Sequence, residues 1–363
     1  MSHSSGSSGN FVASILDFIL RLLGAPKPTP APTPPQPVAP PDNTTEPVRI
    51  VTSRLLLVVY DPIMDQAGTK LSQLMNWNDP DTLANGFIQD ILETSGGNAR
   101  FQIVQRVELN EFPALTDGFR YDPKGYLNVV KGGQPPHQPG TVDYTAILTG
   151  LNVLPRIAQR DIDEVWLMGF PQAGFYESAM GGAGAFWCNS DPLAGTAGCE
   201  RKFVIMGFSY ERGPGEMVHS FGHRVESILA QVFNCQDFIT WAYKPDRAPA
   251  TVNPNLNPFE RFLCFDQIAP GNAGLGTIHY APNSAKDYDY NNPRKVMSSC
   301  DDWLNFPNFQ NNVRQVNADE WGNGNLHVLH KWWLKHLPKV AGRTGGVVNN
   351  WWQYIMDPNL INL

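Results

Sequence analysis

Residues 213–227 of the 363-residue chain have the sequence GPGEMVHSFGHRVES, and they follow directly on the stretch KFVIMGFSYERG at 202–213. Gly213 and Pro214 predict the start of a helix, because proline has a preset φ and lacks only an N–H that would have no partner in the first turn. The apolar stretch before them predicts a buried strand. A strand that leads straight into a helix is typical of an α/β layered fold.

The two faces of this predicted helix differ in chemistry. Residues spaced i, i+3, i+7 and i+10 share an arc of roughly 80° at 3.6 residues per turn. That arc carries two imidazoles and two carboxylates: Glu216, His219, His223 and Glu226. The opposite face is apolar and predicts packing on a core; it consists of Met217, Val218, Phe221, Val225, Ile228, Leu229 and Val232.

Histidines at i and i+4 point the same way and can share one metal ion. The segment HSFGH at 219–223 resembles the active-site helix of the zincin metallopeptidases, whose pattern is His-Glu-x-x-His. The resemblance covers about a dozen residues and implies zinc held by His219 and His223. Ser220 stands where the family has its general-base glutamate, and a serine cannot take a proton from bound water at neutral pH. Leu229 stands where one branch of the family has its third ligand.

The missing ligand and the missing base have candidates elsewhere in the sequence. The loop TIHYAPNSAKDYDYNNP at 277–293 offers nitrogen and oxygen donors. The third ligand is predicted among four residues, Glu226, His279, Asp287 and Asp289, with His279 as the best candidate. An aspartate that does not bind the metal can instead orient a ligating histidine. Glu216, one turn before His219, and Asp289 are the candidate catalytic bases.

An alternative is that the polar side of the helix simply faces water. Polar residues flank the histidine arc: Ser220, Arg224, Ser227 and Gln231. Against this alternative, solvated helix faces are usually built from Lys, Glu and Gln, and this one has two histidines. Gly222 inside the helix costs about 1 kcal/mol relative to alanine, which indicates the close approach of a strand or a ligand.

The bulk composition limits the class of protein. With 42% hydrophobic and 17% charged residues, the chain can bury a large core. A net charge of −7 and a pI near 5.6 argue against nucleic acid as a partner. Two of the five cysteines, Cys188 and Cys199, bracket a short loop and predict a disulfide if the compartment is oxidising; buried free thiols are the open alternative.

The N-terminal region predicts a separate organisation. Residues 1–24 contain a flexible Ser/Gly-rich start and then a short, nearly all-round apolar helix pattern that is too short to span a bilayer. Residues 25–48 form a proline-rich linker, and 49–363 are predicted to be a single large α/β domain. We expect residues 11–24 to contact a membrane surface or an assembly partner, and the protein to be extracytoplasmic or displayed at the cell surface.

Alternating patterns along the rest of the chain predict a mixed or parallel sheet flanked by helices. Predicted strands lie at 50–62, 101–109, 161–171 and 202–213, and predicted helices at 81–94, 145–158 and from 214 to about 241. The segments 110–142 and 245–325 are predicted to be mainly loop, which makes the C-terminal half loop-rich. A further helix with three histidines, ending at Pro338, follows. The sequence contains no nucleotide-binding glycine motif and no Gly-x-Ser-x-Gly elbow.

These features predict a zinc-dependent hydrolase with a zincin-like helix that acts on a peptide or a glycan. The alternative is a non-catalytic, surface-displayed binding or assembly module with a structural metal or none, and Ser220 favours it. Tryptophan and tyrosine side chains lining a cleft beside the histidines would favour a glycan or peptide ligand. Segments such as EVWLMGFPQAGFYES at 164–178 also resemble bacterial proteins to which no activity is attached, so this likeness implies none.

Overall fold

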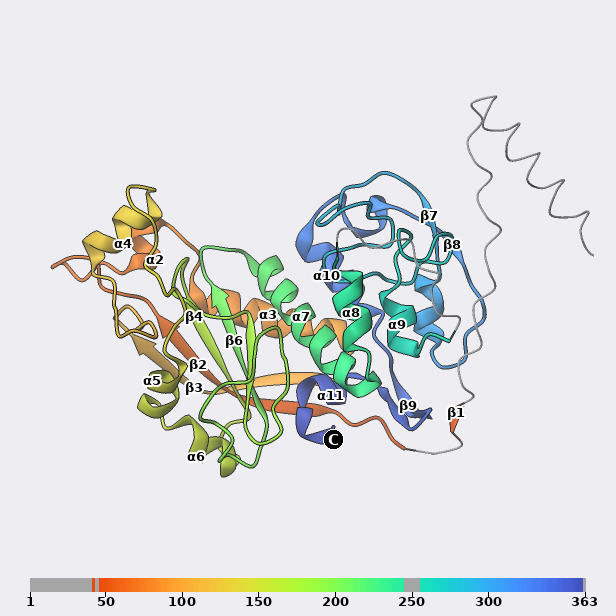
Figure 1. Cartoon of the computed structure of the whole chain (residues 1–363), viewed down its shortest axis with the longest axis horizontal. Coiled ribbons are helices and arrows are strands. Elements are labelled where there is room, and N and C mark those ends of the chain that lie inside the picture. Colours follow the sequence, from red (N-terminus) through yellow and green to blue (C-terminus); the bar gives the residue numbers. More distant parts are fainter. Residues whose placement is uncertain (1–40, 43–45, 245–254, 362–363) are drawn as a thin grey trace, which may run out of the picture.

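The computed structural model of the chain describes residues 41–42, 46–244 and 255–361 (Figure 1). The predicted N-terminal helix at 11–24 and most of the proline-rich linker lie outside these residues. Within the described ranges, no helix combines the length and the apolar composition that crossing a membrane requires. The membrane or assembly contact of residues 11–24 therefore stays a prediction.

A five-stranded sheet in the order β3-β2-β4-β6-β5 forms the centre of the fold. Its strands are β2 (Val51–Tyr60), β3 (Ala99–Leu109), β4 (Glu164–Gly169), β5 (Ser178–Gly181) and β6 (Phe203–Ser209). β2 pairs in parallel with β3 and β4, β4 pairs in parallel with β6, and the edge strand β5 is antiparallel to β6. The predicted α/β class with a mixed sheet is confirmed. The central strands are buried along their length, as their continuous apolar runs predict.

Helices cover both faces of this sheet (Figure 1). α3 (Pro80–Thr94) and α7 (Pro214–Phe233) pack against each other on one face, and α5 (Tyr144–Gly150) and α6 (Val153–Ala158) lie on the other. Asp79 caps α3 by accepting a hydrogen bond from the Thr82 N–H, as Asp–Pro at a helix start predicts. Phe221 of α7 contacts Phe87 of α3, which packs on Trp166 of β4. The apolar face of α7 thus meets the core.

A buried ion pair joins α7 to strand β4 of the sheet. The guanidinium of Arg224 donates to both oxygens of Glu164 on β4, at 2.9 and 3.0 Å. Arg224 is fully buried, and Trp166 and Ser53 also donate to the Glu164 carboxylate. The alternative of a solvated polar face is wrong for most of this face, because Ser220, Arg224 and two residues of the arc, His219 and Glu226, are buried.

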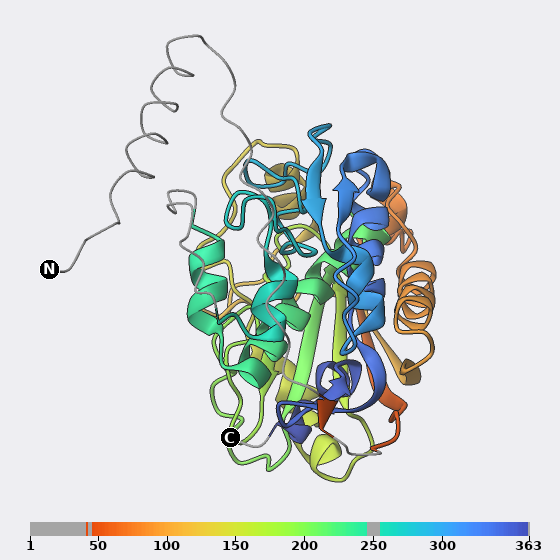
Figure 2. The same cartoon turned by 90° about the vertical axis from the view of Figure 1, so that its right-hand side faces the viewer.

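The C-terminal half packs as a second layer of short elements onto α7 (Figure 2). It contains the helices α8 (Gln236–Ala242), α9 (Pro258–Leu263), α10 (Leu326–Lys335) and α11 (Trp352–Met356), the 3₁₀ helices η1 (Cys300–Asn305), η2 (Ala318–Trp321) and η3 (Pro358–Leu360), and the strands β7 (Val296–Ser298), β8 (Arg314–Val316), β9 (Lys339–Thr344) and β10 (Val347–Asn350). β1 (Pro41–Asp42) pairs with β9. Long loops join these elements, as the composition of this half predicts.

Two local predictions need correction, and two short elements were not predicted. The segment 110–142 is not all loop, because α4 (Pro123–Val130) lies in it behind an Asp122–Pro123 start, and α2 (Leu71–Met75) had no prediction. The expected helix at 145–158 is broken into α5 and α6 at Asn152, which has a left-handed φ of 50°. The glycine-rich stretch after β4 contains β5, whose four residues, Ser-Ala-Met-Gly, show no clear alternation of apolar and polar side chains.

The predicted disulfide between Cys188 and Cys199 is wrong. All five cysteines are free and buried. The Cys188 thiol lies 3.7 Å from the Ser178 hydroxyl, whereas the Cys199 thiol faces the carbonyls of Leu154 and Arg201. Each thiol therefore has its own surroundings, and burial raises the pKa of Cys188 to about 11. The cysteines give no support for an oxidising compartment.

Candidate metal centre

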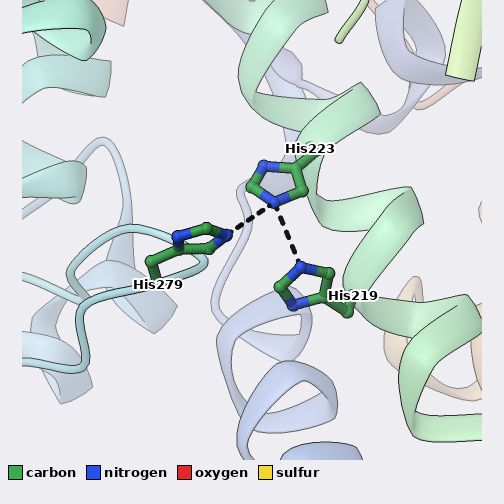
Figure 3. Close-up of side chains that lie close together, drawn as sticks. All are labelled: His219, His223 and His279. Carbon is green, nitrogen blue, oxygen red and sulfur yellow. Dashed lines mark hydrogen bonds between the residues drawn. The ribbon is translucent and has the colours of Figure 1, made fainter. Parts of the chain in front are cut away.

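Three histidines converge on one point beside α7 (Figure 3). His219 and His223 project from successive turns of α7, and His279 comes from the loop between α9 and β7. The Nε2 atom of His223 lies 3.2 Å from Nε2 of His219 and 3.1 Å from Nε2 of His279. The three side chains thus lie close enough to bind one metal ion.

The proton positions on two of these rings follow from their carboxylate partners. Nδ1 of His223 lies 2.9 Å from Glu226, and Nδ1 of His279 lies 2.9 Å from Asp287. An ionised carboxylate only accepts hydrogen bonds, so each Nδ1 carries the proton. In the neutral rings, both Nε2 atoms then present lone pairs to each other at 3.1 Å. A cation between them removes this repulsion.

The spacing of the nitrogens fits a tetrahedral metal ion. Zinc binds imidazole nitrogen at about 2.0–2.1 Å, so two ligands of a tetrahedral ion lie about 3.3 Å apart. The two separations that involve His223, 3.1 and 3.2 Å, are close to that value, and all three ligand atoms lie within 4.8 Å of one another. A donor set of three imidazoles suits zinc and other late first-row ions. The residues present therefore fit a divalent metal ion held by His219, His223 and His279.

The carboxylate of Glu226 orients the His223 ring. It accepts hydrogen bonds from His223 Nδ1 at 2.9 Å, from the Tyr243 hydroxyl at 2.8 Å and from the Ile278 backbone N–H at 2.9 Å. Glu226 is almost fully buried. Glu226 thus contacts Nδ1 of His223, on the side of the ring that faces away from the three converging Nε2 atoms. Asp287 has the equivalent place behind His279 but is about half exposed.

The loop that carries His279 is held tightly against α7. A Cβ atom at Gly222 would lie 2.2 Å from Cδ1 of Ile278, so only glycine allows this approach. The close approach at Gly222 is therefore confirmed, but the neighbour is a loop and not the predicted strand or ligand. The Ile278 carbonyl also accepts hydrogen bonds from His330 of α10 and from Tyr290. Three elements together fix the position of the next residue, His279.

The electrostatics differ among the three rings. Burial and the neighbouring histidines lower the pKa of His219 to about 2, so this ring is neutral. Burial also disfavours the charged form of His223, but the contact with Glu226 outweighs it and raises the pKa of His223. Burial and His223 lower the pKa of His279. Neutral imidazole is the form that binds a metal ion.

The converging nitrogens lie in the wall of an open cavity of about 740 Å³. Aromatic and amide side chains line much of it, including Trp187, Asn189, Gln231, Gln236, Tyr243 and Tyr288. The Tyr288 hydroxyl donates to Nε2 of His279 at 2.8 Å, and burial raises its pKa to about 12. Tyr288 is about half exposed at the cavity.

Neither predicted catalytic base faces this cavity. The Glu216 carboxylate lies 3.3 Å from Arg212 and borders a neighbouring hollow. Asp289 accepts hydrogen bonds from the Ala285 N–H and from Asn292, which shapes its own loop. The Ser220 hydroxyl donates to the Glu216 carbonyl, one turn back along α7.

Sequence reasoning missed three residues that border the cavity. Tyr243 directly follows α8, Tyr288 lies in the DYDY segment, and Glu177 is the residue before β5. The aspartates of the DYDY segment are candidate ligands, and the tyrosine between them, Tyr288, is a polar aromatic residue that the same loop brings to the site. Nothing in the sequence marks Tyr243 or Glu177, because only the fold brings α8 and the edge strand to the histidines.

Comparisons with other proteins add no assignment. No model of a known protein family matches the chain, and no curated protein matches it significantly. The chemistry of the site is therefore inferred from the residues of this chain alone.

Proposed function

We propose that the protein is a zinc-dependent hydrolase that acts on a peptide or a glycan. The observation that carries this proposal is the convergence of three imidazole nitrogens at the wall of an open cavity. Structural zinc sites are usually closed by four protein ligands, whereas catalytic sites have three and keep a position for water or substrate. A bound zinc ion would supply a polarised carbonyl and an acidified water.

The cavity lining supports a peptide or glycan as the ligand. Trp187 is more than half exposed at this cavity, and Tyr243 and Tyr288 lie beside the histidines. Exposed aromatic rings offer flat apolar contact, and the amides of Asn189 and Gln231 offer both donors and acceptors. Such a lining suits a polar chain molecule with few charges.

Turnover of defined substrates tests the proposal. The zinc-loaded protein would be incubated with a fluorogenic peptide library and with acylated oligosaccharides, and the products identified by mass spectrometry. We expect cleavage that a chelator abolishes, that added zinc restores, and that His279→Ala lacks. The matched control is His137→Ala, because His137 pairs with Asp117 and stacks on Phe119 outside this cavity. Chelator-resistant cleavage would contradict the proposal.

The second candidate is a non-catalytic binding module with the same metal. Ser220 favours it, because the serine hydroxyl is tied to a backbone carbonyl and is no base. Under this candidate, the wild type holds zinc without turnover, and cleavage arises only in Ser220→Glu with unchanged zinc content. Cleavage by the wild type rejects the binding module.

A further inference from the structure

Hydrolysis at this centre needs a proton acceptor beside the attacking water, since a positioned base contributes about 10²–10⁴-fold to the rate. The cavity and its surroundings contain several carboxylates, and most are already engaged. Glu226 accepts three hydrogen bonds, and Asp287 is bound to the His279 ring. Asp289 holds its own loop, and Glu216 pairs with Arg212. Each of these four carboxylates is therefore engaged in other contacts and is not placed to accept a proton from the attacking water.

Glu177 differs from all of them in its position. It borders both the histidine cavity and the neighbouring hollow that contains Ser220. Its Oε2 atom accepts a hydrogen bond from the Asn189 side chain at 2.6 Å. Its Oε1 atom has no hydrogen-bond partner in the part of the chain that the structure describes. One carboxylate oxygen is thus held, and the other is available.

A short chain of contacts holds Glu177 at a fixed place relative to α7. Asn189, which binds the Glu177 carboxylate, donates its backbone N–H to the Ser227 hydroxyl at 3.1 Å. Ser227 lies on α7 one turn after His223. Asn189 has a φ of 53°, a left-handed conformation that asparagine tolerates better than most residues. The link ties the carboxylate of Glu177, the residue before β5, to the metal-binding helix.

We propose that Glu177 is the general base of this centre and replaces, from the edge of the sheet, the carboxylate that the helix lacks at Ser220. This inference rests on the proposed function.

The chemical step balances with this one carboxylate. Glu177 takes a proton from the water, and the water oxygen forms a bond to the carbonyl carbon of the substrate. The carbon–nitrogen bond then breaks, and Glu177 gives its proton to the leaving nitrogen, which departs as an amine. The second proton of the water remains with the product acid, so no oxidant or other co-reactant is needed.

A proton count tests the role without a known substrate. Acetohydroxamic acid binds zinc as its anion, and a base in the cavity retains the proton that the acid loses. Calorimetric titration of the zinc-loaded protein in two buffers of different ionisation enthalpy measures the protons released. We expect close to none from the wild type and about one from Glu177→Gln, with unchanged zinc content and weaker binding. Glu211→Gln is the matched control, because Glu211 borders only the neighbouring hollow; it should behave as the wild type.

The other outcomes separate this inference from the proposed function. Equal proton release from the wild type and Glu177→Gln overturns the role of Glu177, as does release that changes only in Glu216→Gln. A wild type that holds no zinc, or that holds zinc but does not bind the hydroxamate, overturns the open zinc centre itself. Once a substrate is known, Glu177→Gln should lower kcat by about 10²–10⁴-fold with little change in KM.

Discussion

Replacing Glu226 with glutamine tests how the metal centre is built. The carboxylate accepts hydrogen bonds from His223 Nδ1, Tyr243 and the Ile278 N–H. In Glu226→Gln, one oxygen becomes an amide nitrogen that can only donate. Either the Nδ1 proton of His223 loses its acceptor or the backbone of the loop does. The ring orientation or the position of His279 then becomes less well defined.

The expected size of the effect distinguishes an orienting residue from a ligand. Loss of a group that orients a ligating histidine weakens metal binding by roughly 10–100-fold, or about 1.4–2.7 kcal/mol. Loss of a ligand, as in His223→Ala, should weaken binding far more. Asp287→Asn should have the smaller effect of the two carboxylate changes, because Asp287 is about half exposed and water can replace it behind His279.

Zinc affinity measured by competition with a chromogenic chelator provides the comparison. We expect the order of affinity wild type, Asp287→Asn, Glu226→Gln and His223→Ala, with circular dichroism unchanged among the four proteins. A Glu226→Gln protein that loses zinc as completely as His223→Ala would show that Glu226 is itself a ligand. A Glu226→Gln protein with wild-type affinity would refute the orienting role.

Three further predictions concern the buried ion pair, the close approach at Gly222 and the five cysteines. Arg224→Met leaves Glu164 buried without its partner, and urea unfolding should show a loss of about 3–5 kcal/mol; a loss under 1 kcal/mol would contradict the buried pair. Gly222→Ala should displace Ile278 and weaken zinc binding. The control is Gly86→Ala in α3, where a Cβ meets no atom within 4 Å; it should leave zinc binding intact and stabilise the fold by up to about 1 kcal/mol. Equal zinc affinities of the two variants would refute the close approach at Gly222. Thiol titration should find five reactive sulfhydryls after denaturation and almost none before it, and a count of three would restore the disulfide.

The strongest local patterns in the sequence predicted the framework of the site. Pro214 after Gly213 predicts the start of α7, and the apolar run before it predicts β6. The spacing of His219 and His223 follows from helix geometry alone. These features depend on residues that are close together in the sequence, so they can be predicted from the sequence alone. The choice of His279 among the candidate third ligands needed the fold, because the helix and the loop meet only in space.

Features that depend on tertiary pairing were not predictable in the same way. β5 exists because its four residues, Ser-Ala-Met-Gly, pair with β6, although their composition favours a strand only weakly. Cys188 and Cys199 are close in sequence, but the chain between them directs their thiols to different neighbours. Glu177 carries no local signal, since its role depends on Asn189 and on the distance to a helix from another part of the chain.

The zinc content of the purified chain tests the central claim most directly. The protein would be dialysed first against zinc and then against zinc-free buffer, and the metal measured by mass spectrometry beside protein concentration. We predict one zinc ion per wild-type chain and per His137→Ala chain, and a clear deficit in His219→Ala and in His279→Ala. Wild-type protein without zinc, or equal zinc in all four proteins, would contradict a centre formed by His219, His223 and His279.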